Sequence, residues 1–101
     1  MKVFKNQQTE LTDIREGKEV KLTYLDLAKL TLNITPKEGW LLDEMRKRIK
    51  LEDKLVGEVD QELQLDDADV ELLLKCAKIP WRAKHKDILR YVDYLEELLK
   101  E

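Results

Sequence analysis

An amphipathic stretch between Thr35 and Val56 constrains the fold more than any other part of the chain. Thr35 is a suitable N-cap, Pro36 suits the first helical position, and Glu38 stands where a capping box places a carboxylate. The pattern predicts a helix over 35–56 with Ile49 in the core. At about 3.6 residues per turn, the side predicted to be buried collects Leu41, Leu42, Met45, Ile49 and Val56, widened by Trp40, Leu51 and Leu55.

Two further helix starts carry a capping-box pattern. Thr23 and Asp66 each stand three residues before an aspartate, Asp26 and Asp69 respectively. These pairs predict a short helix over 24–33 and a third helix that begins after Asp66 and is closed by Pro80. A fourth amphipathic helix is expected from about residue 84 to 99.

The N-terminal segment, residues 1–22, carries the clearest extended signals. Val20 and Leu22 alternate with charged residues after a turn at Glu16-Gly17-Lys18, which predicts a small hairpin. Leu63 and Leu65 alternate in the same way, and we expect them to form a short extended segment that pairs with the strand around Val20 to Leu22.

The composition is consistent with one small domain. The chain has 101 residues, of which 43% are hydrophobic and 41% charged, and the two kinds are interleaved at helical spacing. We therefore predict a mainly α fold within the α+β class: four short helices around one core with a small N-terminal β-hairpin. The single domain spans 1–101, with a hairpin region over 1–22 and a helical region over 23–101.

Charge and cysteine content exclude several classes of protein. The net charge of −3 gives no general attraction to nucleic acid or anionic membranes. Cys76 is the only cysteine, so neither an intrachain disulfide nor a thiolate cluster can form. No apolar run reaches the length of a membrane span, and the start M-K-V-F-K-N-Q-Q lacks the hydrophobic segment of a signal peptide. We expect a cytoplasmic protein without a membrane partner.

The acidic segment 58–71 resembles a calcium loop only superficially. Its carboxylates and amide can be aligned with ligand positions, but Leu65 stands where the sharp turn of such a loop requires glycine, and Asp66 is better used as a helix cap. Catalysis is equally poorly supported, since His85 is the only histidine and the chain has no serine. We predict no metal site, no cofactor and no enzymatic activity. The residues that align with the ligand positions of a calcium loop are Asp60, Glu62, Gln64, Asp66 and Glu71.

Two basic runs, 46–50 and 82–90, leave an alternative open. If they converged on one surface they would meet phosphates, as in a small nucleic-acid-binding regulator. Acidic residues are interleaved with both runs, and no aromatic and glycine pattern of an RNA-binding sheet is present. A solvated charged surface is the favoured interpretation.

The last predicted helix has more apolar surface than one small core needs. Ile88, Val92, Leu95 and Leu99 suffice to dock it on its own domain. A second apolar side on this helix is expected to be an interface, either in a two-fold symmetric homodimer or with another protein. The candidate interface residues are Leu89, Tyr91, Tyr94 and Leu98.

Four segments together resemble a known group of proteins. L-T-Y-L-D-L-A, E-G-W-L-L-D-E-M-R-K-R-I, L-Q-L-D-D-A-D-V-E-L-L-L-K and V-D-Y-L-E occur in this order over residues 20–97. In this arrangement the chain resembles small helical proteins of unassigned role encoded in bacteriophage and prophage gene clusters. The resemblance implies an accessory or assembly role and supplies no catalytic residues. The sequence thus favours a non-enzymatic protein–protein interaction module.

Overall fold

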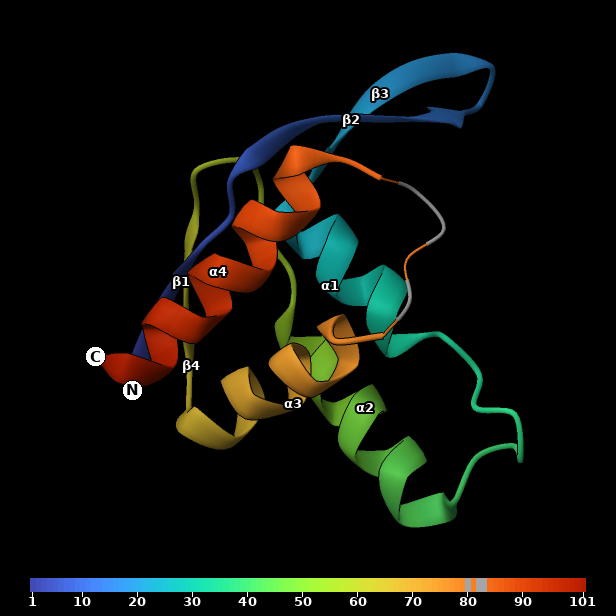
Figure 1. Cartoon of the computed structure of the whole chain (residues 1–101), viewed down its shortest axis with the longest axis vertical. Coiled ribbons are helices and arrows are strands. Elements are labelled where there is room, and N and C mark those ends of the chain that lie inside the picture. The colour runs from blue at the N-terminus through green and yellow to red at the C-terminus, as the bar shows by residue number, and fades with distance from the viewer. Residues whose placement is uncertain (80, 82–83) are drawn as a thin grey trace.

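The computed structural model describes residues 1–79, 81 and 84–101, and in these residues the fold is α+β. Four helices and four strands are present in this part of the chain, the strands forming two separate two-stranded antiparallel sheets. The prediction of a mainly α fold with a single hairpin is therefore wrong (Figure 1). In chain order the elements are β1 (Lys2–Lys5), β2 (Gln8–Arg15), β3 (Lys18–Thr23), α1 (Tyr24–Leu32), α2 (Leu42–Lys54), β4 (Glu62–Leu65), α3 (Asp67–Ala77) and α4 (Lys86–Lys100).

The first sheet joins the N-terminus to the middle of the chain. Strand β1 pairs with β4, with Phe4 opposite Leu63. The predicted pairing of the 63–65 segment with the strand around Val20 is wrong, because β3 is already paired with β2. In β1, Phe4 points into the core and is fully buried, and in β4 Leu65 does the same. The shared buried side of these two strands explains the pairing.

The second sheet is a hairpin around Gly17, so the structure confirms the hairpin predicted from the sequence. Strands β2 and β3 are joined by Glu16 and Gly17, whose φ angles of 54° and 77° both lie in the left-handed region. A two-residue hairpin turn with positive φ at both positions matches the right-handed twist of the strands, and glycine adopts it without strain. The hairpin extends beyond the helices (Figure 1).

Both capping boxes are confirmed. The backbone N–H of Asp26 donates to the Thr23 hydroxyl at 3.3 Å, and the Thr23 N–H donates to the Asp26 carboxylate at 2.8 Å. Asp66 and Asp69 form the same reciprocal pair at the start of α3. The predicted closure of α3 at Pro80 lies outside the described residues.

Helix α2 is shorter than predicted. It begins at Leu42 and not near Thr35, because the chain turns first: the Gly39 N–H donates to the Pro36 carbonyl at 3.0 Å, and Gly39 has a φ of 83°. A residue in the left-handed region cannot continue an α-helix. The segment between α1 and α2 is therefore a connection.

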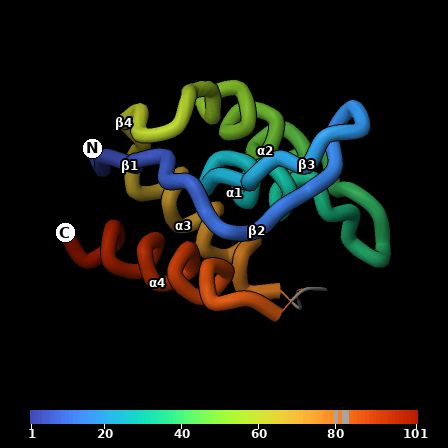
Figure 2. The backbone as a smooth tube through the Cα atoms, turned by 90° about the horizontal axis from the view of Figure 1, so that it is seen from above, coloured from blue at the N-terminus to red at the C-terminus, as the bar shows by residue number. Residues whose placement is uncertain are grey.

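The core lies between α1, α3, α4 and strand β1, which runs alongside α4 (Figure 1 and Figure 2). An aromatic cluster of Phe4, Tyr24, Tyr91 and Tyr94 fills its centre, with ring centroids 5.3 to 6.5 Å apart. The two chain ends lie close together, where the Lys2 ammonium donates to the Glu101 carbonyl. The N-terminal strand is thereby fixed along the last helix.

A buried asparagine connects three segments. Asn6, only 1% exposed, accepts a hydrogen bond from the Leu25 N–H at 2.9 Å and donates from its amide to the Glu58 carbonyl at 3.1 Å. Its backbone N–H donates to Gln61 and its carbonyl accepts from Asp60. Asn6 therefore ties the β1–β2 connection to the start of α1 and to the turn before β4.

We expect Asn6→Ala to lower the free energy of unfolding by about 1 to 3 kcal/mol, because it leaves the buried Leu25 N–H without a partner and removes a partly buried hydrogen bond to the Glu58 carbonyl. Urea unfolding at neutral pH measures the change. The matched control is Gln64→Ala in β4, an exposed side chain whose removal should cost less than about 0.5 kcal/mol. Equal losses for the two variants would contradict the role assigned to Asn6.

A second polar contact holds the hairpin against α4. The buried Asp87 carboxylate accepts the Glu10 backbone N–H at 2.7 Å and the Arg90 guanidinium at 3.0 Å. The Glu10 hydrogen bond lowers the pKa of Asp87, helped by the charges of Arg90 and His85. Because the folded protein favours the ionised form, this contribution to stability is present at neutral pH and is lost as the pH falls through the lowered pKa.

We expect Asp87→Asn to reduce the free energy of unfolding by about 1 to 2 kcal/mol at pH 7, as is typical of a lost charge-assisted hydrogen bond. The deficit should begin to shrink below about pH 4, where the Asp87 carboxylate of the unfolded chain becomes protonated, and shrink further as the pH falls through the lowered pKa of the folded protein. Denaturant unfolding over a pH series measures both. Asp93→Asn, at an exposed position of the same helix, is the control and should show little deficit. A deficit in Asp87→Asn that does not change with pH would contradict a stabilising contribution from the Asp87 charge.

Candidate interaction surface

One side of α2 fastens the helix to the core. Leu51 is 1% exposed and Leu55 is fully buried. The Arg48 guanidinium donates to Glu44 at 3.2 Å and to the Leu32 carbonyl at 3.3 Å, and it lies 4.6 Å from the centre of the Trp40 ring. These contacts hold α2 against the end of α1 and against the connection between α1 and α2.

The opposite side of α2 presents apolar residues to solvent. Leu42 is 65% exposed and Ile49 is 54% exposed, and Leu41 and Val56 are exposed as well. The prediction that this side is buried, with Ile49 in the core, is therefore wrong. We define the α2 outer face by the exposed side chains along this side of the helix and just after its end: Leu42, Arg46, Ile49, Asp53 and Val56.

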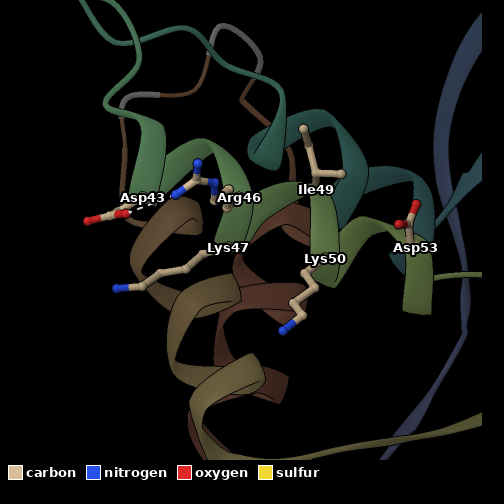
Figure 3. A pocket seen from close by; sticks show the side chains of 6 residues that line it. All are labelled: Asp43, Arg46, Lys47, Ile49, Lys50 and Asp53. Carbon is tan, nitrogen blue, oxygen red and sulfur yellow. Dashed lines mark ion pairs between the residues drawn. The ribbon is translucent and has the colours of Figure 1, made fainter.

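Charged side chains flank the α2 outer face. Figure 3 shows Arg46, Ile49 and Asp53 on one side of the helix and Lys47 and Lys50 on the other. Together with Asp43 they line a depression to which α2 alone contributes, so it is an open surface and not an enclosed ligand site.

The Arg46 charge is available to a partner. Its guanidinium lies 3.7 Å from the Asp43 carboxylate, and both side chains are highly exposed. An exposed pair of this kind contributes little to stability, so exchanging it for a new partner costs little.

A groove on the other side of Ile49 extends the apolar surface. It runs between α2 and the connection that follows α1, and Trp40, Met45 and Ile49 contribute its apolar lining. Arg48 and Glu52 supply charge at its wall. A helix-sized partner on the α2 outer face would therefore also reach the Trp40 ring.

The interface predicted on the last helix is not exposed. Tyr91 and Leu98 are buried in the chain's own core, and burial raises the pKa of the Tyr91 hydroxyl. Tyr94 is half-buried, and its hydroxyl accepts the Lys5 backbone N–H at 2.7 Å. Of the four predicted residues only Leu89 remains exposed. The reason is that β1 and α1 cover the second side of α4, so the prediction of a patch there is wrong.

The predicted basic runs lie on different elements. Residues 46–50 are on α2, whereas Lys84, His85 and Lys86 stand at the start of α4, well separated from α2 (Figure 1). Arg82 lies outside the described residues. Arg90 is paired with Asp87. The part of the second run that the structure describes therefore does not join the first run on one surface.

The remaining candidate residues have structural roles. Glu62 and Gln64 belong to strand β4, and Asp66 caps α3, so the 60–71 segment is not a loop. In the described residues no group of three or more His, Cys, Asp and Glu side chains is arranged to hold a metal ion. Cys76 is buried on α3, where burial raises the pKa of its thiol. None of the helices within the described ranges has the length and apolarity to cross a membrane.

The sequence contained a signal for the exposed side of α2. Leu51 and Leu55 lie roughly 160° around the helix from Leu42 and Ile49, so α2 has two apolar sides and one core can cover only one of them. Pro36 and Gly39 also mark a turn before Leu42. Arg46 and Asp53 carry no such signal, because charged residues are usual on a solvated helix.

We expect Leu51→Ala to cost about 2 to 5 kcal/mol of unfolding free energy, as a large-to-small change in a core, and Ile49→Ala on the same helix to cost less than about 1 kcal/mol. Guanidinium unfolding of the two variants measures this difference. A larger loss at Ile49 than at Leu51 would reverse the assignment of the two sides.

Comparison with known proteins adds no assignment, since no protein-family model, no curated protein and no solved structure matches this chain. Function is therefore argued from the α2 outer face itself.

Proposed function

We propose that the protein is a non-enzymatic protein–protein interaction module whose contact surface is the α2 outer face. The observation that carries this proposal is the exposure of Leu42 and Ile49 on a helix whose other side is anchored by Leu51 and Leu55. Large apolar side chains aligned on one face and bordered by charges are typical of helix-mediated recognition. The anchored side supplies a rigid support for the contact.

The resemblance of residues 20–97 to small phage and prophage proteins suggests where such a module acts. We propose an accessory or assembly role in a phage context, in the cytoplasm, in which the protein binds itself or another protein. A contact surface without a catalytic group is sufficient for this role.

The proposal is tested by photo-crosslinking in the cells that naturally contain the protein. With a photoreactive residue in place of Leu42, discrete protein adducts are expected, because this position lies on the exposed apolar line. The matched control carries the photoreactive residue at Glu71, an exposed position on α3. Adducts of equal yield from both positions, or none from position 42, would contradict the proposal.

A salt titration separates this proposal from nucleic-acid binding through residues 46–50 and 82–90. We expect little binding of the purified protein to random duplex DNA, even at low salt, because Arg48 is engaged within the fold and acidic residues are interleaved with the basic residues of α2. Affinity that falls steeply with rising salt would instead support the regulator. The variant Lys47→Glu with Lys50→Glu should then abolish that affinity.

A further inference from the structure

We propose that the α2 outer face binds the same face of a second copy of the chain, with the two α2 helices antiparallel and related by a two-fold axis beside Ile49. This inference rests on the proposed function and names the partner of that surface. It replaces the last helix, on which only Leu89 of the four predicted interface residues is exposed, as the site of self-association. Two features of the face carry it: the spacing of its apolar residues and the order of its charges.

The apolar residues form a line that suits a second helix. Leu42 and Ile49 are spaced by seven residues, so they stay on nearly the same side of α2, and Val56, seven residues further on, directly follows the end of the helix. All three are exposed. With an antiparallel copy centred on Ile49, the two Ile49 side chains meet at the axis and Leu42 meets Val56 of the second copy at each end. Every apolar residue on the line then has an apolar partner.

The charges select the antiparallel arrangement. At about 100° per residue, Arg46 and Asp53 lie on the same side of the line through Leu42 and Ile49, and Figure 3 shows both side chains on the same side of the helix as Ile49. A two-fold axis between antiparallel helices brings this side against itself, so Arg46 of each copy meets Asp53 of the other, and the pair forms twice. A parallel two-fold arrangement would place the Arg46 and Asp53 side chains of the two copies on opposite edges of the contact, where they do not pair with each other. The face is complementary to itself in one direction only.

The same charges select the register. If one copy slides along the other by seven residues in one direction, the two Arg46 side chains meet. If it slides by seven residues in the other direction, the two Asp53 side chains meet. Both registers bring like charges together and are unfavourable. Only the register centred on Ile49 pairs opposite charges and also pairs the apolar residues. Two independent properties of the face therefore give the same arrangement.

The contact is small, which sets the expected strength. Helix α2 has 13 residues, a length of roughly 20 Å, and the Trp40 groove adds a limited area beside it. An interface of this size belongs to the weak, transient class. Self-association should therefore appear at high micromolar protein concentration and be absent at low micromolar concentration.

Sedimentation velocity over a concentration series tests the inference. The wild-type chain should pass from monomer to dimer, and Ile49→Asp should raise the dissociation constant at least about tenfold by placing two carboxylates at the axis. Because Ile49 is exposed, this variant should unfold at nearly the wild-type temperature. A wild-type chain that stays monomeric throughout, or a dimer that Ile49→Asp leaves intact, overturns the inference.

A charge exchange identifies the arrangement. Arg46→Asp alone and Asp53→Arg alone should each be monomeric where the wild-type chain is dimeric, whereas an equimolar mixture of the two should associate, because every facing pair is then opposite in charge. The double variant Arg46→Asp with Asp53→Arg should dimerise like the wild-type chain. Lys47→Asp is the matched control, with the same charge change outside the face. A mixture that stays monomeric overturns the inference.

The outcome also separates this inference from the proposed function. Crosslinks from position 42 to a different protein, with a monomeric purified chain, would remove the second copy as partner and leave the interaction module standing. Crosslinks between copies support both, and no crosslinks at all contradict both.

Discussion

The buried Asn6 is the constraint on which the arrangement of the sheets depends. A polar side chain that is almost fully removed from water must have its hydrogen bonds satisfied, and Asn6 finds its partners at the start of α1 and in the turn before β4. Movement of the start of α1 would break a buried hydrogen bond, and movement of the turn would break a partly buried one. The position of Asn6 between β1 and β2 therefore fixes where one sheet ends and the hairpin begins.

This constraint decides which helix carries the exposed apolar surface. With β1 held in place, Phe4 packs against Tyr94 with the ring centroids 5.6 Å apart, and the second side of α4 is covered. A domain of this size has one core, and the buried side chains of α4 fill much of it. Helix α2 contributes Leu51 and Leu55 to that core, and its remaining apolar residues stay on the surface.

The correct sequence-based predictions depend on local interactions, and the wrong ones on distant contacts. A capping box is decided within three residues and the hairpin turn by Glu16 and Gly17, so both could be predicted. The pairing of β1 with β4 joins residues about sixty positions apart and depends on burial that periodicity does not show. For α2, the sequence analysis joined two apolar sides into one broad buried side, because periodicity does not indicate how much of a helix one core can cover. The exposed side around Leu42 and Ile49 was therefore predicted to be buried, and the candidate surface was missed.

The two ends of α2 differ in how firmly they are held, and this difference bears on recognition. At the C-terminal end Leu51 and Leu55 are buried, and the Lys54 ammonium lies 2.8 Å from the Asp69 carboxylate. At the N-terminal end no side chain caps the helix, and Leu42 is exposed. Without a side-chain cap, the first N–H groups of α2 lack the stabilisation that the capping boxes give to α1 and α3. A partner that covers Leu42 would therefore add contacts at the end of α2 that has no cap.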